Sequence, residues 1–500
     1  CISLIEFIKS SFSYKDLKKN SLRELHLNIP KGQCVLLCGA SGCGKTTLTR
    51  LVNGLIPHFF EGRLSGKVTI NEMAIAETEI STISDVVGTV FQNPRTQFFN
   101  TDTDSEIVFG LENRTLDSKE LKQHFEKVVK DLHIEKLRGR SIFELSGGEK
   151  QKIAFASVYA TNPDIFVLDE PSSNLDFHSV IELRKLIEKI KKQEKTIIIA
   201  EHRLWYLIDI ADRVILMKDG QIFKDMSMQD FRKLSSEQIQ NMGLRCRNFS
   251  EIKTNISAEK SSERILELKD ISVKYRDRII LQNISFAVNG GEIIAITGAN
   301  GAGKTTLART ICGLIKQNSG NIFINSNKLP AKVRTKKSYM VMQDVGHQLF
   351  TDSVKTECTL GTKTIDDAYV DETLSMLSLS ELKDRHPLSL SGGQKQRLAV
   401  AISLLCDKEV LVFDEPTSGL DLKSMQEVGA MVERLSEQGK ILLVITHDIE
   451  FIKTICSRVL VLSGGQMIAD LKGKEKENIE NYFLTGGYRN ESKKHITSLV

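Results

Sequence analysis

Two glycine-rich segments of this 500-residue chain have the residue types that bind a chain of phosphates. Glycine lets backbone N–H groups approach phosphate oxygens, lysine neutralises their charge, and the first threonine of each Thr-Thr pair offers a hydroxyl to Mg²⁺. A chance match to one complete loop is improbable, and two occur here. The residues predicted to bind nucleotide are Gly39, Ala40, Ser41, Gly42, Cys43, Gly44, Lys45, Thr46 and Thr47 in the first half and Gly298, Ala299, Asn300, Gly301, Ala302, Gly303, Lys304, Thr305 and Thr306 in the second.

An Asp-Glu pair ends an apolar run in each half. Asp169 and Asp414 follow these runs directly, where a carboxylate can hold Mg²⁺. Glu170 and Glu415 come next and can polarise an attacking water. The alternative is an ordinary strand terminus, but the glycine loops upstream favour catalysis. The sequence therefore predicts Mg²⁺-dependent hydrolysis of a nucleotide.

A Leu-Ser-Gly-Gly tetrad precedes a helix-forming segment in each half. A hydroxyl, bare N–H groups and the positive end of a helix dipole make an anion site. The alternative is a simple serine helix cap. Because neither half has a second phosphate loop, we expect each tetrad to close over the nucleotide held by the other half. The tetrad residues predicted to bind nucleotide are Ser146, Gly147 and Gly148, and Ser391, Gly392 and Gly393.

Strands and helices must position these groups. A short apolar run precedes each glycine loop, and helix-prone segments follow at 47–55 and 306–314, which is the context that a phosphate loop requires. The runs 165–168 and 410–413 are apolar throughout, as in central strands of a parallel sheet covered on both faces. Segment 226–246 is predicted to be helical.

The motifs of the two halves can be matched by the offset between their residue numbers, which is constant over one segment and changes over another. The offset is 259 between the two loop lysines (304 − 45), 251 between Gln92 and Gln343 (343 − 92), and 245 between the tetrad serines (391 − 146). It stays at 245 through the Asp-Glu pairs and a later histidine. This pattern predicts fixed catalytic chemistry beside a segment that contacts different partners.

Composition limits the class of protein. The chain is 41% apolar and 26% charged with a net charge of +4, which indicates globular domains and gives no reason to expect a nucleic acid partner. No apolar stretch is long enough to span a bilayer, so a membrane role would need partner chains. Nine scattered cysteines indicate reduced thiols in a cytoplasm. We predict a first domain at 1–247, a polar linker at 248–262, a second domain at 263–490 and a tail at 491–500.

Taken together, these motifs resemble an ATP-binding-cassette protein with two fused nucleotide-binding domains, over nearly the whole chain. The resemblance implies an α/β fold with two P-loop NTPase domains, each with a mostly parallel sheet and a helical signature subdomain. It implies a head-to-tail intramolecular dimer that binds ATP and Mg²⁺ at two competent sites. The implied roles are adenine stacking by Tyr14 and Tyr275, contact with Mg²⁺ and a membrane partner by Gln92 and Gln343, Mg²⁺ binding by Thr46, Asp169, Thr305 and Asp414, D-loop positions for Asp176 and Asp421, catalysis by Glu170 and Glu415, and a switch role for His202 and His447.

The residues after Gln92 and Gln343 narrow the family. Both have a second glutamine five residues on and an apolar-Phe pair, a pattern that resembles the ATPase subunits of energy-coupling-factor importers. The alternative is that these phenylalanines are core residues. The resemblance implies a transmembrane coupling protein, a membrane protein that captures a vitamin or metal ion, and a location on the cytoplasmic face of the membrane. The competing interpretations are a fused sugar-importer ATPase, a soluble translation factor of the superfamily and a purely binding, non-transport role. No residue identifies the solute.

Overall fold

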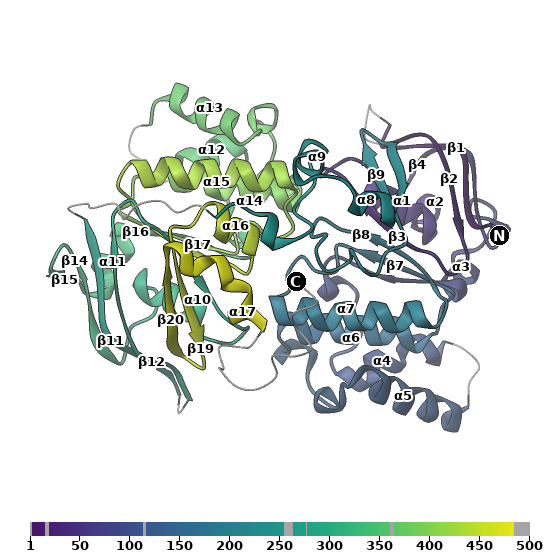
Figure 1. Ribbon diagram of the computed structural model, residues 1–500, viewed down its shortest axis with the longest axis horizontal. Coiled ribbons are helices and arrows are strands. Elements are labelled where there is room, and N and C mark those ends of the chain that lie inside the picture. The colour runs from purple at the N-terminus through teal and green to yellow at the C-terminus, as the bar shows by residue number, and fades with distance from the viewer. Residues whose placement is uncertain are drawn as a thin grey trace. The chain divides into compact units, whose positions relative to one another are not determined.

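The computed structural model describes residues 3–15, 20–113, 117–254, 264–276, 278–360 and 365–484. Two compact units are present, unit 1 at residues 1–247 and unit 2 at residues 248–500. Most of the predicted linker and all of the predicted tail lie outside the described residues. The helices and strands of both units carry the labels of Figure 1.

Unit 1 begins with an antiparallel sheet of order β2(Leu22–Pro30)-β1(Ser3–Tyr14)-β4(Gly62–Ile70)-β5(Met73–Ala74). In β2 the buried positions alternate, since Leu25, Leu27 and Ile29 face the core and the residues between them are exposed. This alternation is typical of a sheet with one covered face.

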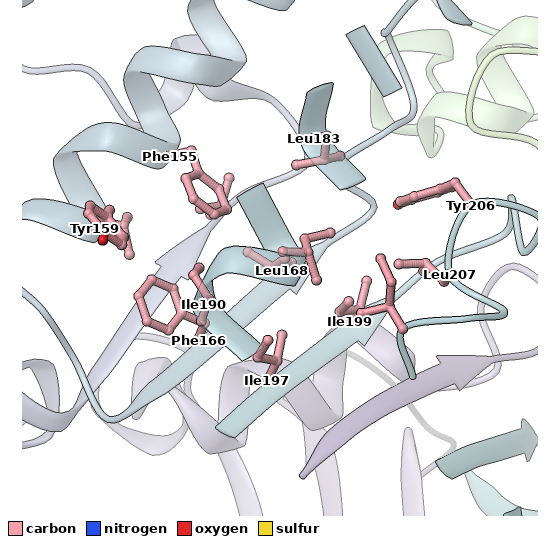
Figure 2. Close-up of a cluster of buried hydrophobic side chains, with 14 of the residues drawn as sticks. Phe155, Tyr159, Phe166, Leu168, Leu183, Ile190, Ile197, Ile199, Tyr206 and Leu207 are labelled. Atoms are coloured by element: carbon pink, nitrogen blue, oxygen red, sulfur yellow. The ribbon is translucent and has the colours of Figure 1, made fainter. Parts of the chain in front are cut away.

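The second sheet of unit 1 has the order β10(Gln221–Ser227)-β9(Arg213–Lys218)-β3(Cys34–Cys38)-β8(Thr196–Ala200)-β7(Ile165–Asp169)-β6(Val87–Val90). Every pair in it is parallel except β9 with β10. All five residues of β3, β7 and β8 are buried, as predicted for the apolar runs. Figure 2 shows Phe166 and Leu168 of β7 in one core with Ile197 and Ile199 of β8.

The helices of unit 1 include a helical group beside this sheet. The longest of that group, α5 and α6, pack on each other and on α4, and their apolar residues join the core of β7. The predicted helical segment 226–246 contains two short helices, and its first residues belong to β10. The helices are α1(Lys45–Val52), α2(Leu55–His58), α3(Ile80–Val86), α4(Thr103–Glu112), α5(Ser118–Leu132), α6(Gly147–Ala160), α7(Phe177–Lys192), α8(Met228–Arg232) and α9(Ser236–Asn241).

Unit 2 repeats the architecture. Its sheets have the orders β12(Arg278–Asn289)-β11(Ile265–Tyr275)-β14(Ser319–Ile324)-β15(Asn327–Lys328) and β16(Ser338–Val341)-β17(Val410–Asp414)-β18(Ile441–Ile445)-β13(Ile293–Thr297)-β19(Arg458–Ser463)-β20(Gln466–Lys472). Its helices are α10(Lys304–Ile311), α11(Ala331–Lys337), α12(Val354–Thr359), α13(Asp367–Met376), α14(Gly392–Leu405), α15(Leu422–Glu437), α16(Ile449–Thr454) and α17(Ile479–Leu484). The predicted class, two α/β domains with mostly parallel sheets and a helical subdomain, is confirmed.

Strand register brings the predicted site residues of each unit to one sheet edge. In unit 1 Ala200 pairs with Leu37 on one side and with Asp169 on the other. In unit 2 Ile445 pairs in the same way with Ile296 and Asp414. Because parallel strands end at the same edge, the glycine loop, the Asp-Glu pair and the histidine of each half meet there.

Candidate nucleotide-binding sites

Each glycine loop joins a buried strand to a helix, with backbone conformations that glycine tolerates. Gly39, Gly42 and Gly44 have φ of 140°, 76° and 110°, in the region that side chains disfavour. A Cβ on Gly39 would lie 2.3 Å from the carbonyl oxygen of Met217, and one on Gly298 would lie 2.0 Å from that of Leu462. The loops are therefore tight cradles at helix N-termini, which fits an anionic ligand.

The loop lysines are buried and directed back over their own loops. Lys45 Nζ donates to the carbonyl oxygens of Gly39 and Ala40 at 3.0 and 3.2 Å. Lys304 Nζ donates to those of Gly298 and Ala299 at 2.6 and 3.0 Å. Lys45 Nζ also lies 3.4 Å from His202 Nε2. Both ammonium groups thus lie inside the cradle where phosphate charge would be neutralised.

A threonine hydroxyl and a carboxylate meet in each unit, as the Mg²⁺ prediction requires. Thr46 Oγ1 donates to Asp169 Oδ1 at 3.4 Å, and Thr305 Oγ1 donates to Asp414 Oδ2 at 2.9 Å. Burial, together with the charge of Glu170, raises the pKa of Asp169 to about 6. Burial also raises the pKa of Asp414. A divalent cation would relieve this unfavourable burial of negative charge, so the donor set fits Mg²⁺.

The two glutamates predicted to be catalytic share an unusual backbone. Glu170 has φ of 46° and Glu415 has φ of 53°, the left-handed region that costs a side-chain-bearing residue free energy. In unit 1 Glu170 Oε2 accepts a hydrogen bond from Gln92 Nε2 at 2.7 Å, and its Oε1 lies 3.2 Å from His202 Nε2. In unit 2 the distance from Glu415 Oε1 to His447 Nε2 is 3.5 Å. Gln343 is exposed.

A buried acid that the sequence analysis missed accepts hydrogen bonds from the backbone around the histidine of unit 1. Glu201 accepts hydrogen bonds from the backbone N–H groups of His202 and Arg203 at 2.7 and 3.1 Å, and from the Tyr206 hydroxyl at 2.8 Å. Tyr206 is fully buried beside Leu207 (Figure 2). A glutamate directly after a buried strand and before the histidine was the available signal. Unit 2 has Thr446 at that place, so the two histidines are supported differently.

The loop that begins at Gln92 in unit 1 and at Gln343 in unit 2, here called the Q-loop, contains a second glutamine with a structural role. Gln97 Oε1 accepts from the N–H of Phe91 at 3.2 Å, and Gln348 Oε1 accepts from that of Met342 at 2.8 Å. Gln348 Nε2 also donates to the Met340 carbonyl at 2.6 Å. The side chain therefore holds the strand end that carries the Q-loop, which explains why the spacing is the same in both halves.

One buried glutamate in each unit, which the sequence analysis also missed, fixes the backbone of the phenylalanine two residues after the second glutamine. Glu106 Oε2 accepts from the N–H groups of Phe99 and Asn100 at 3.0 and 2.8 Å. Glu357 Oε2 accepts from those of Phe350 and Thr351 at 2.9 and 2.8 Å. Both glutamates are 2% exposed, whereas Phe99 and Phe350 are both 76% exposed. Their shared offset of 251 (357 − 106) could have revealed them, since it equals the offset of the Q-loop glutamines.

The tetrad serines and the D-loop aspartates cap helices. Ser146 and Ser391 are the N-caps of α6 and α14, and each forms a capping box with the residue three positions on. Asp176 and Asp421 cap α7 and α15 through backbone N–H groups at 2.8 Å. The capping interpretation of the serines is thus met. Gly147 and Gly392, the first residue after each serine, are exposed and leave the helix N-termini accessible to an anion.

The two tyrosines assigned to adenine lie in different surroundings. Tyr14 is half-buried, and its hydroxyl lies 3.4 Å from Thr47 Oγ1. Tyr275 is 69% exposed, with its ring centroid 5.8 Å from the Arg276 guanidinium. The two units thus share the phosphate cradle and differ beside it.

Comparison with known proteins agrees with this fold. The family model described as "ABC transporter" matches residues 22–173 and 281–418. A "Putative ABC transporter ATP-binding protein" of Treponema denticola is 64% identical over 476 residues, covering 94% of this chain and 97% of that protein. The "Putative HMP/thiamine import ATP-binding protein" of Bacillus subtilis is 32% identical, with 90% and 88% covered. A chain of the solved structure "Model of ribosome-bound archaeal Pelota and ABCE1" has a TM-score of 0.71 at 21% identity, with 96% and 81% covered, which shows the fold alone.

The fold and the paired sites define a P-loop ATPase with two nucleotide-binding domains in one chain. The chain belongs to the ABC transporter family. It is an ABC ATPase that uses ATP with Mg²⁺. Among the described residues, no helix has both the length and the apolar character that crossing a bilayer requires.

Proposed function

We propose that this protein is the ATP-hydrolysing subunit of a membrane importer of the energy-coupling-factor type. The observation that carries the proposal is the exposed phenylalanine beside each Q-loop. Phe99 and Phe350 are 76% exposed although their loops are fixed by buried glutamates. A rigidly held and solvent-exposed aromatic side chain is typical of an anchor for a protein partner.

The proposed partner is a transmembrane coupling protein that receives Phe99 and Phe350, together with a membrane protein that captures the solute. This places the chain at the cytoplasmic face of the membrane. The relative from Bacillus subtilis, named for HMP and thiamine import, supports a vitamin-like solute. A fused ATPase of another importer class is the second candidate, and the paired Gln-to-Phe spacing favours the first.

We assign the chemistry to the residues that meet at each sheet edge. Glu170 and Glu415 polarise the attacking water, and their carboxylates are placed by the left-handed backbone and by the neighbouring histidines. The lysines and glycine loops hold the phosphates, and Mg²⁺ on the Thr-Asp pairs would offset phosphate charge. The contact between Gln92 and Glu170 gives a direct route from the partner-facing loop to the reacting groups of unit 1.

The test combines partner capture with ATPase activity. The affinity-tagged chain is purified from native membranes, and attached proteins are identified by mass spectrometry. Wild type should retain integral membrane proteins of the importer, and Phe99→Ala with Phe350→Ala should lose them while keeping ATPase activity within about twofold. Phe223→Ala is a matched control, because Phe223 is also exposed and lies on the edge strand β10.

Two results would contradict the proposal. Recovery of ribosomes in place of membrane proteins would favour a soluble translation factor. Retention of the same membrane proteins by the double phenylalanine variant would show that these side chains are not the anchors. For the chemistry, Glu170→Gln with Glu415→Gln should bind ATP and lose turnover, and near-normal turnover would refute the catalytic assignment.

A further inference from the structure

The tyrosine of unit 1 is held against the phosphate loop by two hydrogen bonds. Arg50 Nη1 donates to the Tyr14 hydroxyl oxygen at 3.0 Å, and that hydroxyl lies 3.4 Å from Thr47 Oγ1. Either hydroxyl can be the donor in this contact, because each has one proton to donate and two lone pairs to accept with. Thr47 is the last residue of the phosphate loop. The Tyr14 hydroxyl is therefore hydrogen-bonded to a side chain of the loop that is predicted to bind phosphate.

A second aromatic residue keeps this arrangement in place. The Arg50 guanidinium lies 4.0 Å from the centroid of the Phe60 ring, within the range of a cation–π contact. The Phe60 ring also packs edge-on to Tyr14 with centroids 6.1 Å apart, and Phe12 packs on Tyr14 at 4.9 Å. The ring and the hydroxyl of Tyr14 are thus both restrained.

Unit 2 has the same polar residues without the restraint. Thr306 and Arg309 correspond to Thr47 and Arg50 at the offset of 259 (306 − 47 and 309 − 50). Tyr275 is nevertheless 69% exposed and lies beside Arg276. Within the described part of unit 2, no hydrogen bond joins Tyr275 to Thr306 or Arg309. The difference must therefore come from what surrounds the tyrosine.

An insertion in unit 1 supplies the difference. The offset falls from 259 at Thr47 to 254 at Ser65 (319 − 65), so unit 1 has five more residues between them, and Phe60 lies in this stretch. The extra residues let β4 begin at Gly62, which pairs with Tyr14. In unit 2 the corresponding pairing begins only at Ser319 with Ser272. The insertion extends the sheet to Tyr14 and brings Phe60 against it.

We propose that Arg50 and Phe60 are positioning residues that hold Tyr14 on Thr47, so that the first nucleotide site must release Tyr14 before it binds ATP. The second site needs no such release, because Tyr275 is exposed. The two sites therefore differ in nucleotide affinity although their phosphate loops are equally complete. This inference depends on the proposed assignment of both loops and both tyrosines to nucleotide binding.

The test measures each site separately in the full-length chain. The probe is ATP with a fluorescent ribose label, titrated with Mg²⁺ present. Lys304→Ala removes the second site and leaves the first to be read, and Lys45→Ala does the reverse. In the first background Tyr14→Phe should lower the Kd by about threefold to tenfold, since the ring is kept and a hydrogen bond no longer has to break. In the second background Tyr275→Phe should bring no such decrease in the Kd, because no hydrogen bond joins Tyr275 to Thr306 or Arg309 in the described part of unit 2.

A second pair of variants tests the role of the arginine in each unit. Arg50→Met should tighten the first site in the same direction, and Arg309→Met should not tighten the second. Melting temperatures within about 2 °C of the parent would separate altered binding from altered folding. An unchanged or raised Kd for Tyr14→Phe, or an equal gain for Tyr275→Phe, would overturn the inference. Binding of the probe at two sites with the wild-type Kd in both lysine backgrounds would instead refute the nucleotide-site assignment and remove this inference with it.

Discussion

Replacing Glu106 by alanine should lower the stability of unit 1 by about 2–4 kcal/mol. The Glu106 carboxylate is buried and accepts from the backbone N–H groups of Phe99 and Asn100 at 3.0 and 2.8 Å, and from Asn100 Nδ2 at 3.3 Å. Alanine would leave the two backbone donors without their acceptor. The loop that presents Phe99 would then lose its fixed conformation.

The magnitude follows from the cost of unpaired donors. Each buried N–H that loses its partner costs about 1–3 kcal/mol, and two are affected. The two together could cost about 2–6 kcal/mol, and access of water at the loop surface would place the total in the lower half of that range, at about 2–4 kcal/mol. Glu106→Gln keeps an acceptor but loses the charge, so we expect about 1 kcal/mol for it. The expected order is therefore alanine, then glutamine, then wild type.

The single tryptophan of the chain makes the assay specific to unit 1. Trp205 stacks on Phe177 with ring centroids 4.9 Å apart, and both belong to unit 1. Urea unfolding followed by its fluorescence therefore reports that unit. With a urea dependence of about 3 kcal/mol per molar for a domain of this size, the alanine variant should shift the midpoint downward by about 1 M.

The matched control is Glu126→Ala. Glu126 makes a surface ion pair with Arg138 at 3.2 Å and is 48% exposed, so its loss should cost less than about 0.5 kcal/mol. The reasoning fails if Glu106→Ala lies within about 0.5 kcal/mol of wild type, or if the two variants shift the midpoint equally.

Two further predictions concern the glycine loop and the buried thiols. Gly39→Ala should weaken ATP binding at the first site by more than about tenfold, because the added Cβ would lie 2.3 Å from the Met217 carbonyl oxygen. Gly42→Ala should weaken it less, because no atom lies within 4 Å of the added Cβ. Titration with labelled ATP compares the two variants, and an equal loss of affinity would contradict the steric argument. Burial raises the pKa of the Cys38 and Cys456 thiols to about 12, so both thiols are almost fully protonated at pH 8. They should therefore escape alkylation by iodoacetamide in the native protein and react with it in urea. Mass spectrometry of the cysteine peptides measures the extent of alkylation, and equal labelling in the two states would refute the prediction.

Much of the fold could be predicted from the sequence because its signals are local. Short apolar runs produced the central strands β3, β7 and β8, and glycine spacing placed the phosphate loops after a strand and before a helix. The segment 226–246 was harder, since its first residues add a strand to the sheet edge and only two short helices follow. Pairing with β9, a tertiary contact, overrode the local helical pattern there.

The candidate site, like the fold, could be predicted from the sequence only in part. The sequence singled out Lys45, Asp169, Glu170 and His202, and the structure brings them to one edge of the sheet. It missed Glu201, because the residue types alone do not show that this carboxylate is buried and accepts a hydrogen bond from the Tyr206 hydroxyl.

The sequence by itself determined the chemistry of this protein: two complete phosphate loops, two Asp-Glu pairs and a constant register between tetrad and histidine. Only the tertiary structure decided how equal the two halves are. Tyr14 and Tyr275 occupy matching positions, yet one is held on the phosphate loop and the other is exposed. The physical reason is that a motif records residue types along the chain, whereas burial and hydrogen bonding depend on segments that folding brings beside it. Here that segment is the longer stretch between Thr47 and Ser65, which includes Phe60.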